Sequence, residues 1–400
     1  MSRYDAVVVG AGILGLAVAR AVRRADPGAT VAVLECEPEV GAHQTSHNSG
    51  VIHSGVYYKP GSLKARLCVE GATAMYEFCD THGIPTRRCG KLIIARRPGE
   101  LVRLDELERR GRANKVSGLT RVTAHGIPEI EPNAAGVAAL HIASTGIVDY
   151  GRVARVLADE LRADGVDIHC GVAVDRVIPR RSVAVIEHAK GAIEASRVIV
   201  CAGLWSDRVA RRSGAGPDPR IVPFRGAYLR LKEVDPPLVS GLVYPVPDPA
   251  LPFLGVHITP TIDGAVLLGP TALPVASRTA YRLATLSLHD ALETLIWPGS
   301  WRAARDLWWP GLDEARMAAS RRAFVRACAD YVPSLSLGDL DGTGPAGVRA
   351  QAMARDGSLL DDFVIERDGP VAHVRNAPSP AATSAFALAA EIVRRLGPDT

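Results

Sequence analysis

The stretch that decides the fold runs from residue 4 to residue 35 and reads YDAVVVGAGILGLAVARAVRRADPGATVAVLE. It opens on a short valine-rich run, residues 4–9, that is typical of a buried strand. Gly10-Ala11-Gly12-Ile13-Leu14-Gly15 follows and starts a helical pattern that continues to Arg24. A second apolar run, residues 31–34, ends in Glu35. Strand, G-x-G-x-x-G turn, helix, strand and acid in this order predict a dinucleotide-binding βαβ unit.

Each residue type in this turn has a physical task. Gly10 allows the tight turn, Gly12 lets the backbone come close to a pyrophosphate, and Gly15 lets the helix pack on the strand. The helix begins at Ile13 and Leu14, where free N–H groups and the positive end of the helix dipole favour a phosphate. The sequence therefore predicts that these five residues contact the cofactor.

Glu35 can accept hydrogen bonds from an adenosine ribose and would repel a 2′-phosphate. The motif alone does not separate NAD from FAD, and a glycine-rich turn without a ligand is the alternative. A second buried strand, residues 197–201, runs into the small turn Ala202-Gly203 far downstream. Such a late return to the sheet indicates a first domain split by an insertion, which is common in flavoproteins. We expect Ala202, Gly203 and Val174, in the strand-like piece 172–177, to line the cofactor site.

Length and composition narrow the class further. Four hundred residues exceed what one core usually holds, so we expect two domains. Hydrophobic residues make up 47% and charged residues 22%, which excludes a disordered, collagen-like or coiled-coil chain. Lys and Arg number 47 against 43 Asp and Glu, with no basic stripe, so we expect no nucleic-acid partner. No apolar run reaches the roughly 20 residues that a transmembrane helix needs.

Cysteine and histidine patterns argue against metals and disulfides. The seven cysteines are odd in number and lack C-x-x-C spacing, and the histidines show no H-E-x-x-H pair. We therefore expect no metal, and a reducing compartment, the cytoplasm.

Longer motifs carry a resemblance to a known family. The glycine turn with Glu35, together with residues 198–207, resembles the D-amino-acid-oxidase-type FAD-dependent oxidoreductases. Further segments resemble one branch of them, the L-2-hydroxyglutarate dehydrogenases/oxidases. The segments are residues 43–60 (HQTSHNSGVIHSGVYYKP), 145–150 (TGIVDY), 222–226 (VPFRG), 244–248 (YPVPD), 253–257 (FLGVH), 344–352 (GPAGVRAQA) and 373–384 (HVRNAPSPAATS).

The same comparison shows departures. Thr271 stands where the family's Gly-Pro segment usually continues with Asn, residues 272–280 match poorly, and residues 295–340 match loosely. If any of these residues touch the distal end of the substrate, the resemblance does not determine the exact substrate.

The resemblance implies an α/β fold with FAD as the cofactor. A discontinuous Rossmann-like FAD domain would comprise residues 1–85, 145–212 and 340–400. A β-rich substrate domain would comprise residues 86–144 and 213–339.

Two segments are expected beside the cofactor. The loop 41–61 is polar and too long to be a mere connector. We expect Thr45, Ser46, Ser49 and Gly50 in it to bind phosphate or the flavin edge. The second segment contains Asn376, Ser379 and Ala381 and leads into a helical run predicted over residues 381–394. Ser379-Pro380 is a good helix start, and that helix N-terminus would stabilise negative charge on the reduced flavin.

Three residues are candidates for the chemistry. His53 precedes Ser54-Gly55, and an imidazole with a pKa near 6.5 suits proton abstraction from an alcohol. His257, within the strand-like run 253–259, is a rival base, and either histidine could instead only orient its neighbours. Arg349 follows a glycine loop, and its planar fork suits a substrate carboxylate. A surface arginine paired with a nearby Asp is the alternative, and Arg225 is a weaker candidate for a second carboxylate.

The resemblance implies oxidation of L-2-hydroxyglutarate to 2-oxoglutarate by hydride transfer to flavin N5. Rivals are an oxidase or dehydrogenase of another 2-hydroxy acid, an amino acid or a secondary amine, an NAD-dependent dehydrogenase, and a flavin-binding protein without turnover. Electrons would pass to oxygen, to a quinone or to an electron-transfer partner. Trp297, Trp301, Trp308 and Trp309 stand among arginines, a pattern that suits packing of a small domain or, alternatively, peripheral contact with a membrane.

Overall fold

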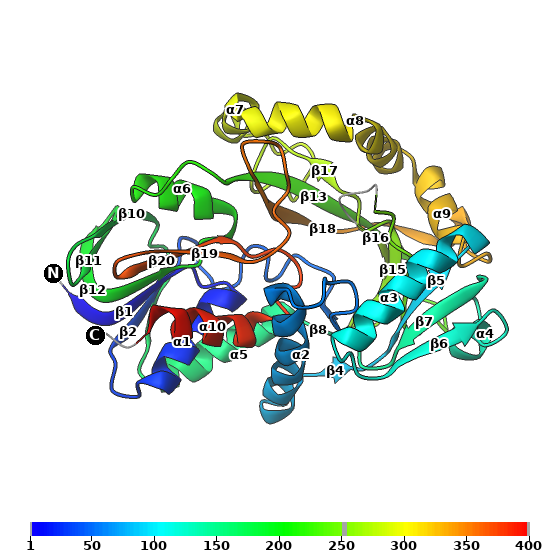
Figure 1. Ribbon diagram of the computed structural model, residues 1–400, viewed down its shortest axis with the longest axis horizontal. Coiled ribbons are helices and arrows are strands. Elements are labelled where there is room, and N and C mark those ends of the chain that lie inside the picture. Colours follow the sequence, from blue (N-terminus) through cyan, green and yellow to red (C-terminus); the bar gives the residue numbers. More distant parts are fainter. Residues whose placement is uncertain (1, 250–253, 398–400) are drawn as a thin grey trace.

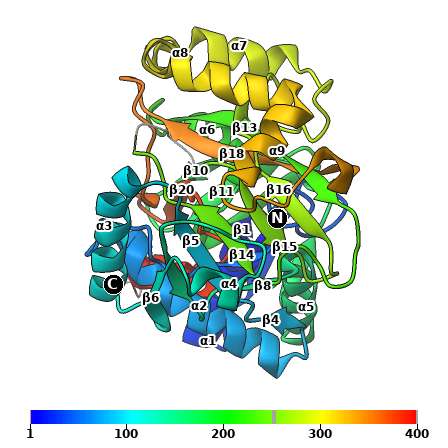
Figure 2. The same ribbon diagram turned by 90° about the vertical axis from the view of Figure 1, so that its right-hand side faces the viewer.

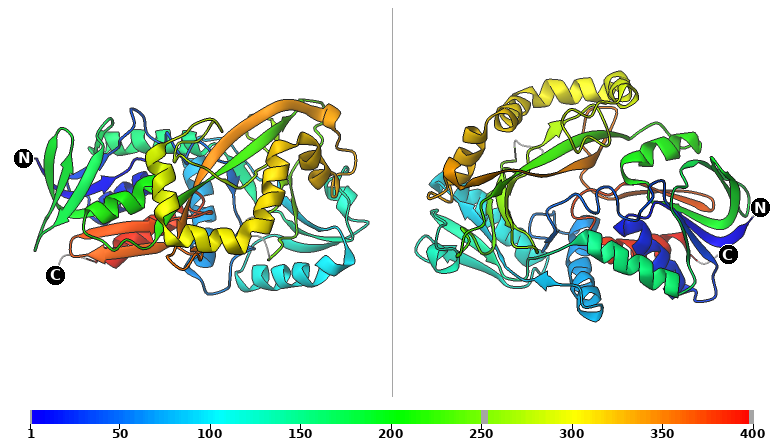
Figure 3. Two further views of the ribbon diagram at one scale, coloured as in Figure 1. Left: turned by 90° about the horizontal axis from the view of Figure 1, so that it is seen from above. Right: turned by 180° about the vertical axis from the view of Figure 1, so that it is seen from behind.

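The computed structural model describes residues 2–249 and 254–397, built mainly on two sheets that lie side by side along the long axis (Figures 1 and 3). The first sheet has the strand order β10-β11-β12-β1-β2-β9, while β20 pairs with the second half of β12 and β19 with β20. Its strands are β1 (Arg3–Val9), β2 (Val31–Leu34), β9 (Asp167–His169), β10 (Val174–Pro179), β11 (Ala184–His188), β12 (Gly191–Val200), β19 (Val364–Asp368) and β20 (Val371–Asn376).

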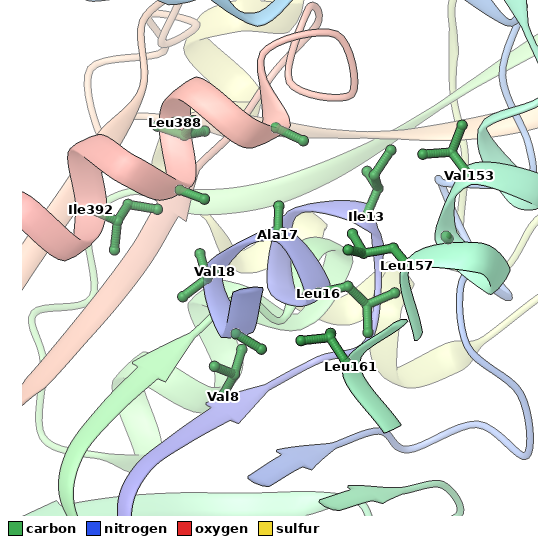
Figure 4. Packing of buried hydrophobic residues seen from close by; sticks show 14 of the residues in the cluster. Val8, Ile13, Leu16, Ala17, Val18, Val153, Leu157, Leu161, Leu388 and Ile392 are labelled. Carbon is green, nitrogen blue, oxygen red and sulfur yellow. The ribbon is translucent and has the colours of Figure 1, made fainter. Parts of the chain in front are cut away.

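The predicted βαβ unit is the centre of this sheet. β1 pairs in parallel with β2 on one side and with β12 on the other, so the expected late return of the chain to this sheet is confirmed. The helix α1 (Ile13–Ala25) joins β1 to β2 and packs against α5 (Tyr150–Ala163) and α10 (Ala385–Leu396). Figure 4 shows Leu16 of α1 beside Leu157 and Leu161 of α5, in a core where every one of these side chains is buried.

The second sheet has the order β17-β13-β16-β15-β14-β5-β7-β6, and β18 lies on the other side of β13 for most of its length (Figure 2). Its strands are β5 (Lys91–Ala95), β6 (Leu119–Thr123), β7 (Ala138–Ile142), β13 (Arg220–Leu231), β14 (Leu242–Pro245), β15 (His257–Pro260), β16 (Val266–Gly269), β17 (Leu273–Pro274) and β18 (Leu340–Met353). Around the two sheets lie the helices α3 (Leu101–Ala113), α4 (Ile127–Ile130), α6 (Ser206–Arg212), α7 (Leu288–Ile296), α8 (Pro298–Ala319) and α9 (Arg321–Ala329).

A small third sheet connects the long polar loop to the rest of the fold. It consists of β3 (Val51–Ile52), β8 (Gly146–Val148) and β4 (Thr86–Arg87), in the order β3-β8-β4. The helix α2 (Leu63–Thr81) follows the loop and packs on α10. His53 comes directly after β3, so this sheet fixes where the loop places it.

Two expectations about the C-terminal part are wrong. β18 pairs with β13 over most of its length, so residues 340–353 belong to the second sheet and not to the FAD domain. The last helix begins at Ala385 rather than near Ser379, because residues 381–384 form turns. Tertiary hydrogen bonds hold those turns: the hydroxyl of Thr383 bonds with the hydroxyl of Tyr150 (2.9 Å) and donates to the carbonyl of Val51 (3.2 Å).

Candidate active site

A cavity of about 410 Å³ lies where the glycine turn, the polar loop and the segment after β12 meet. The structure places on its wall seven residues that the sequence pointed to: Gly10, Gly12, Glu35, Thr45, Val174, Ala202 and Gly203. The wall also contains residues that the motifs did not single out, among them Cys36, Trp205, Arg208, Arg212 and His289. Both arginines are already paired with carboxylates, Arg208 with Asp290 and Glu293 and Arg212 with Asp175, so the backbone of the glycine turn is the main partner left for a pyrophosphate.

Glycine is required at the three positions of the turn for different physical reasons. Gly10 has φ +102°, and a Cβ there would lie 2.5 Å from the carbonyl oxygen of Cys201. A Cβ on Gly15 would lie 1.9 Å from the carbonyl oxygen of Gly10, so this glycine is needed for packing. A Cβ on Gly12 would meet only the Oγ1 of Thr45, at 3.3 Å. The protein thus leaves space in front of Gly12, which is where a pyrophosphate would lie.

Glu35 is buried at the end of β2 and organises the turn. One carboxylate oxygen accepts the N–H of Ala11 (2.7 Å), and the other accepts the N–H of Glu37 (3.0 Å). On α1 the N-cap Gly12 provides no side-chain cap, and the N–H of Ile13 donates to Thr45 Oγ1 (3.0 Å). The cradle, the acid and the helix terminus fit the ADP half of FAD.

The other predicted cofactor residues lie off this wall, and their contact with FAD stays a prediction. Ile13, Leu14 and Gly15 form the first turn of α1. Ser46 donates to the carbonyl of Gly41, and the hydroxyl of Ser49 is within hydrogen-bonding reach of Tyr228. Gly50 has φ +71° against Val148. The amide of Asn376 donates to the carbonyls of Leu360 and Asp362, and Ser379 and Ala381 lie in the turns before α10.

A group of possible metal ligands lies at the rim of the cavity, at Cys36, Glu37 and His43, whose ligand atoms are within 4.8 Å of one another among the described residues. Both imidazole nitrogens of His43 are already engaged, one with Glu37 (2.8 Å) and one with the hydroxyl of Tyr281 (2.9 Å). Burial and the neighbouring Glu35 raise the pKa of Cys36 to about 12, so its thiol stays protonated. These contacts argue against a metal.

A row of polar side chains crosses one face of the second sheet. His257 on β15 lies opposite Gly269 of β16, and Tyr244 of β14 packs against its imidazole with ring centres 3.8 Å apart and planes 22° apart. Tyr228 of β13 lies over Gly269, where a Cβ would come within 2.7 Å of its ring. Arg349 on β18 lies close enough to His257 to affect its pKa. Five strands, far apart in sequence, thus contribute to one surface.

His257 is buried and is fixed in one tautomer. Its Nδ1 lies 2.8 Å from the carbonyl oxygen of Gly255, which can only accept, so Nδ1 carries the hydrogen and Nε2 keeps a free lone pair. Burial lowers its pKa to about 3. The imidazole is therefore neutral at neutral pH with a free lone pair at Nε2, and the lowered pKa makes it a weaker base than an exposed histidine. Phe253, at the start of the predicted strand, lies outside the described residues, and β15 begins only at His257.

His53 faces the same space from the polar loop. Its N–H donates to Thr383 Oγ1 (3.1 Å), and its Nδ1 is buried with no hydrogen-bond partner among the described residues. Burial, followed by the charges of Lys91 and His257, holds its pKa well below the usual value. His53 is therefore also neutral. The two candidate bases lie near each other, and both remain candidates for the proton acceptor.

Arg349 is half-buried, and burial lowers its pKa, while Tyr228 and Glu314 oppose that shift. Arg225, the weaker candidate, is engaged elsewhere: its Nε and Nη2 both donate to the carbonyl of Tyr281 (3.3 and 3.2 Å). Arg349 thus lies near His257, which in turn lies near His53. Sequence reasoning missed Lys91 on this surface, for which the only signal was a single charge at the start of the apolar run 91–95.

The segments that depart from the family pattern have structural partners. Thr271 is buried and closes the edge of β13, because its Oγ1 accepts the N–H of Ala227 (3.1 Å). In the stretch 272–280, the buried Arg278 pairs with Asp207 of α6. This ion pair links the stretch to α6.

The fold and site define a dinucleotide-dependent oxidoreductase: one sheet carries a dinucleotide cavity, and the second presents neutral histidines and an arginine. The family model described as FAD dependent oxidoreductase matches residues 5–395. Among solved structures, FAD-bound, dithionite-reduced L-alpha-glycerophosphate oxidase from Mycoplasma pneumoniae superposes with a TM-score of 0.81 at 22% identity, covering 100% of this chain and 96% of that one. Glycine oxidase from Geobacillus kaustophilus gives 0.73 at 19%, covering 99% and 95%.

Closer relatives share a more specific name. L-2-hydroxyglutarate dehydrogenase of Indibacter alkaliphilus is 42% identical over 96% of each chain. The human mitochondrial L-2-hydroxyglutarate dehydrogenase is 44% identical over 98% of this chain and 88% of its own length, and the Nematostella vectensis protein of that name is 45% identical over 96% and 89%. The chain therefore belongs to the FAD-dependent oxidoreductases and, within them, to the L-2-hydroxyglutarate dehydrogenase family. FAD is its cofactor, which excludes the NAD-dependent alternative.

Proposed function

We propose that the protein oxidises L-2-hydroxyglutarate to 2-oxoglutarate. The names of its relatives support this substrate. The observation that carries the proposal is that Arg349 lies near His257, and His257 near His53, since a 2-hydroxy acid needs a carboxylate receptor and a proton acceptor close together. A flavin-binding protein without turnover would need neither.

Each residue has a defined part in the reaction. Arg349 binds the C1 carboxylate and so orients the Cα–H bond. A neutral histidine accepts the hydroxyl proton, and His257 offers Nε2 for this because Gly255 holds its Nδ1–H. Bound FAD supplies the acceptor for the hydride that leaves Cα.

The test is an anaerobic titration of the purified holoprotein, followed by flavin absorbance. L-2-hydroxyglutarate is compared with its D-enantiomer, L-malate, L-lactate and sarcosine, which represent other hydroxy acids and a secondary amine. Bleaching by L-2-hydroxyglutarate at the lowest concentration supports the proposal. Bleaching by sarcosine or L-lactate alone would replace it with one of the rival oxidases.

We propose that the reduced enzyme passes its electrons to a quinone or an electron-transfer partner at a membrane surface rather than to oxygen. α7 and α8 lie along one outer edge of the molecule (Figure 1). The loop before α7, α7 itself and the first turns of α8 carry large exposed apolar side chains. Leu286, Leu288 and Ile296 are 77%, 84% and 66% exposed, and Trp301 is 64% exposed. Exposed arginines at 282, 302 and 305 would complement anionic lipid. Trp297 packs inside, and the side chains of Trp308 and Trp309 lie outside the described residues.

No helix in the described ranges is long and apolar enough to cross a bilayer, so contact would be peripheral. Co-sedimentation with anionic vesicles, and turnover with a soluble quinone compared with oxygen, test this part. We also place the protein in a reducing compartment such as the cytoplasm, since all seven cysteines are free thiols.

A further inference from the structure

Lys91 is a buried lysine whose ammonium group has no counter-ion among the residues that the structure describes. It is 1% exposed, and its Nζ lies over the ring of Tyr244, 4.0 Å from the centre, and 5.3 Å from that of Tyr57. Among the described residues, no hydrogen bond or ion pair involves this Nζ. The other buried lysine, Lys64, differs: its Nζ donates to the carbonyl and to the carboxylate of Asp361, both at 2.8 Å. A buried cation without an anion is costly for a protein to keep, which points to an anionic ligand.

Lys91 lies on the reaction surface. Its Nζ is 4.0 Å from the centre of the Tyr244 ring, and that centre lies 3.8 Å from the centre of the His257 imidazole. The distance from the ammonium group to the centre of the imidazole is therefore at most the sum of these two distances. The charge of Lys91 also acts on His53. The groups that bear on Lys91 itself are the neutral thiols of Cys68 and Cys89, and no carboxylate is among them.

The order of strands puts two cations on opposite sides of His257. Reading across the sheet, Arg349 lies on β18, His257 on β15 and Lys91 on β5, with β14 between the last two. A molecule held by both cations would therefore carry two negative groups, and the carbon between those groups would lie near His257. Arg225 does not compete for the second group, because it donates to the carbonyl of Tyr281.

We propose that Lys91 binds the second carboxylate of the substrate, the one distal to the reacting carbon, and so selects dicarboxylic over monocarboxylic 2-hydroxy acids. This inference rests on the proposed function, because it assigns the second carboxylate of that substrate. Tyr57 and Tyr244 act as positioning residues that hold the ammonium group where the carboxylate arrives.

The test combines one substitution with one change of ligand. L-2-hydroxyglutarate is compared with L-2-hydroxypentanoate, which has the same carbon chain and lacks the distal carboxylate. Anaerobic stopped-flow reduction of the holoenzyme gives Kd for each. In Lys91→Met, Kd for L-2-hydroxyglutarate should rise on the order of 10²-fold, whereas Kd for L-2-hydroxypentanoate should change by less than about threefold. Lys91→Arg should restore part of the lost selectivity, because it restores the charge.

Lys64→Met is the matched control, since it removes a buried lysine whose charge is already paired; it should leave the ratio of the two Kd values unchanged. An equal loss for both substrates in Lys91→Met, or a lost ratio in Lys64→Met, would overturn the assignment. FAD content is measured first in every variant.

A second ligand pair separates failure of this inference from failure of the proposed function. Glutarate and pentanoate cannot be oxidised at a hydroxyl carbon, and their binding is followed through the flavin absorbance. If L-2-hydroxyglutarate fails to reduce the wild type, the proposed function is wrong. Tighter binding of glutarate than of pentanoate, lost in Lys91→Met, would still support Lys91 as a carboxylate receptor. Equal binding of glutarate and pentanoate by the wild type would refute it.

Discussion

Replacing Lys91 with methionine should make the ligand-free protein more stable. Burial lowers the pKa of Lys91 from its usual 10.5 to about 7. Each pKa unit corresponds to about 1.4 kcal/mol, so the protonated amine costs the folded state on the order of 5 kcal/mol. The cation–π contacts with Tyr244 and Tyr57 return roughly 1–2 kcal/mol of this. Burial is the larger effect, and Lys91→Met, which keeps a similar apolar stem, should stabilise by about 3 kcal/mol at neutral pH.

The lowered pKa of Lys91 also determines whether the stability of the protein rises or falls with pH. Between the folded pKa of about 7 and the unfolded value of 10.5, the unfolded chain binds more protons at this site than the folded protein. Stability of the wild type therefore rises with pH in that window, and the destabilisation by Lys91 is complete below about pH 7. The advantage of Lys91→Met should be largest near pH 6 and should nearly vanish near pH 10.5.

The measurement is urea unfolding of FAD-free protein followed by tryptophan fluorescence, supported by calorimetry. With an unfolding entropy of about 2 cal/mol/K per residue, 3 kcal/mol corresponds to a rise in Tm of roughly 4 °C for a chain of this size. Lys64→Met should shift stability in the opposite direction, because it breaks the contacts of Nζ with Asp361. A Lys91→Met protein that is no more stable than the wild type near pH 6, or whose advantage does not shrink in alkali, would refute the reasoning.

Three further predictions concern the site. Gly12→Ala should fold and lose FAD, because within the protein its Cβ would meet only Thr45 Oγ1, at 3.3 Å, and would otherwise occupy the space of the pyrophosphate. Gly15→Ala should fold poorly, because its Cβ would lie 1.9 Å from a carbonyl oxygen. Circular dichroism with flavin absorbance separates the two, and a yellow Gly12→Ala protein contradicts the first. His53→Ala or His257→Ala should slow flavin reduction by roughly 10²-fold or more, and wild-type rates in both mean that neither is the base. Arg349→Ala should lower the reduction rate and weaken substrate binding, with Arg349→Lys restoring only part; unchanged values in an FAD-loaded Arg349→Ala protein remove it as the carboxylate receptor.

The sequence by itself determined the cofactor half of the molecule. The glycine turn, the helix after it and Glu35 are contiguous, and each signals its structure through local backbone freedom, hydrophobic period or a hydrogen-bonding acid. For this reason β1, α1 and β2 occur where the sequence predicts them, and the parallel partner β12 was also foreseen from its apolar run and small turn. The long family motifs then named the chemistry and the residues His53, His257 and Arg349.

Only the tertiary structure decided how the reaction surface is assembled. β18 pairs with β13 across more than a hundred residues of sequence, and this pairing, which no local pattern encodes, moved Arg349 into the second sheet. The start of α10 was set by Thr383 bonding to Val51 and Tyr150, which outweighed a continuous helical pattern. In the sequence Lys91 looks like an ordinary residue at the start of a strand, and only the folded chain shows that it is buried, with no carboxylate paired to it in the described part of the chain. Register between distant strands and the cost of burying a charge are properties of the folded chain, so they appear only once the sheet is built.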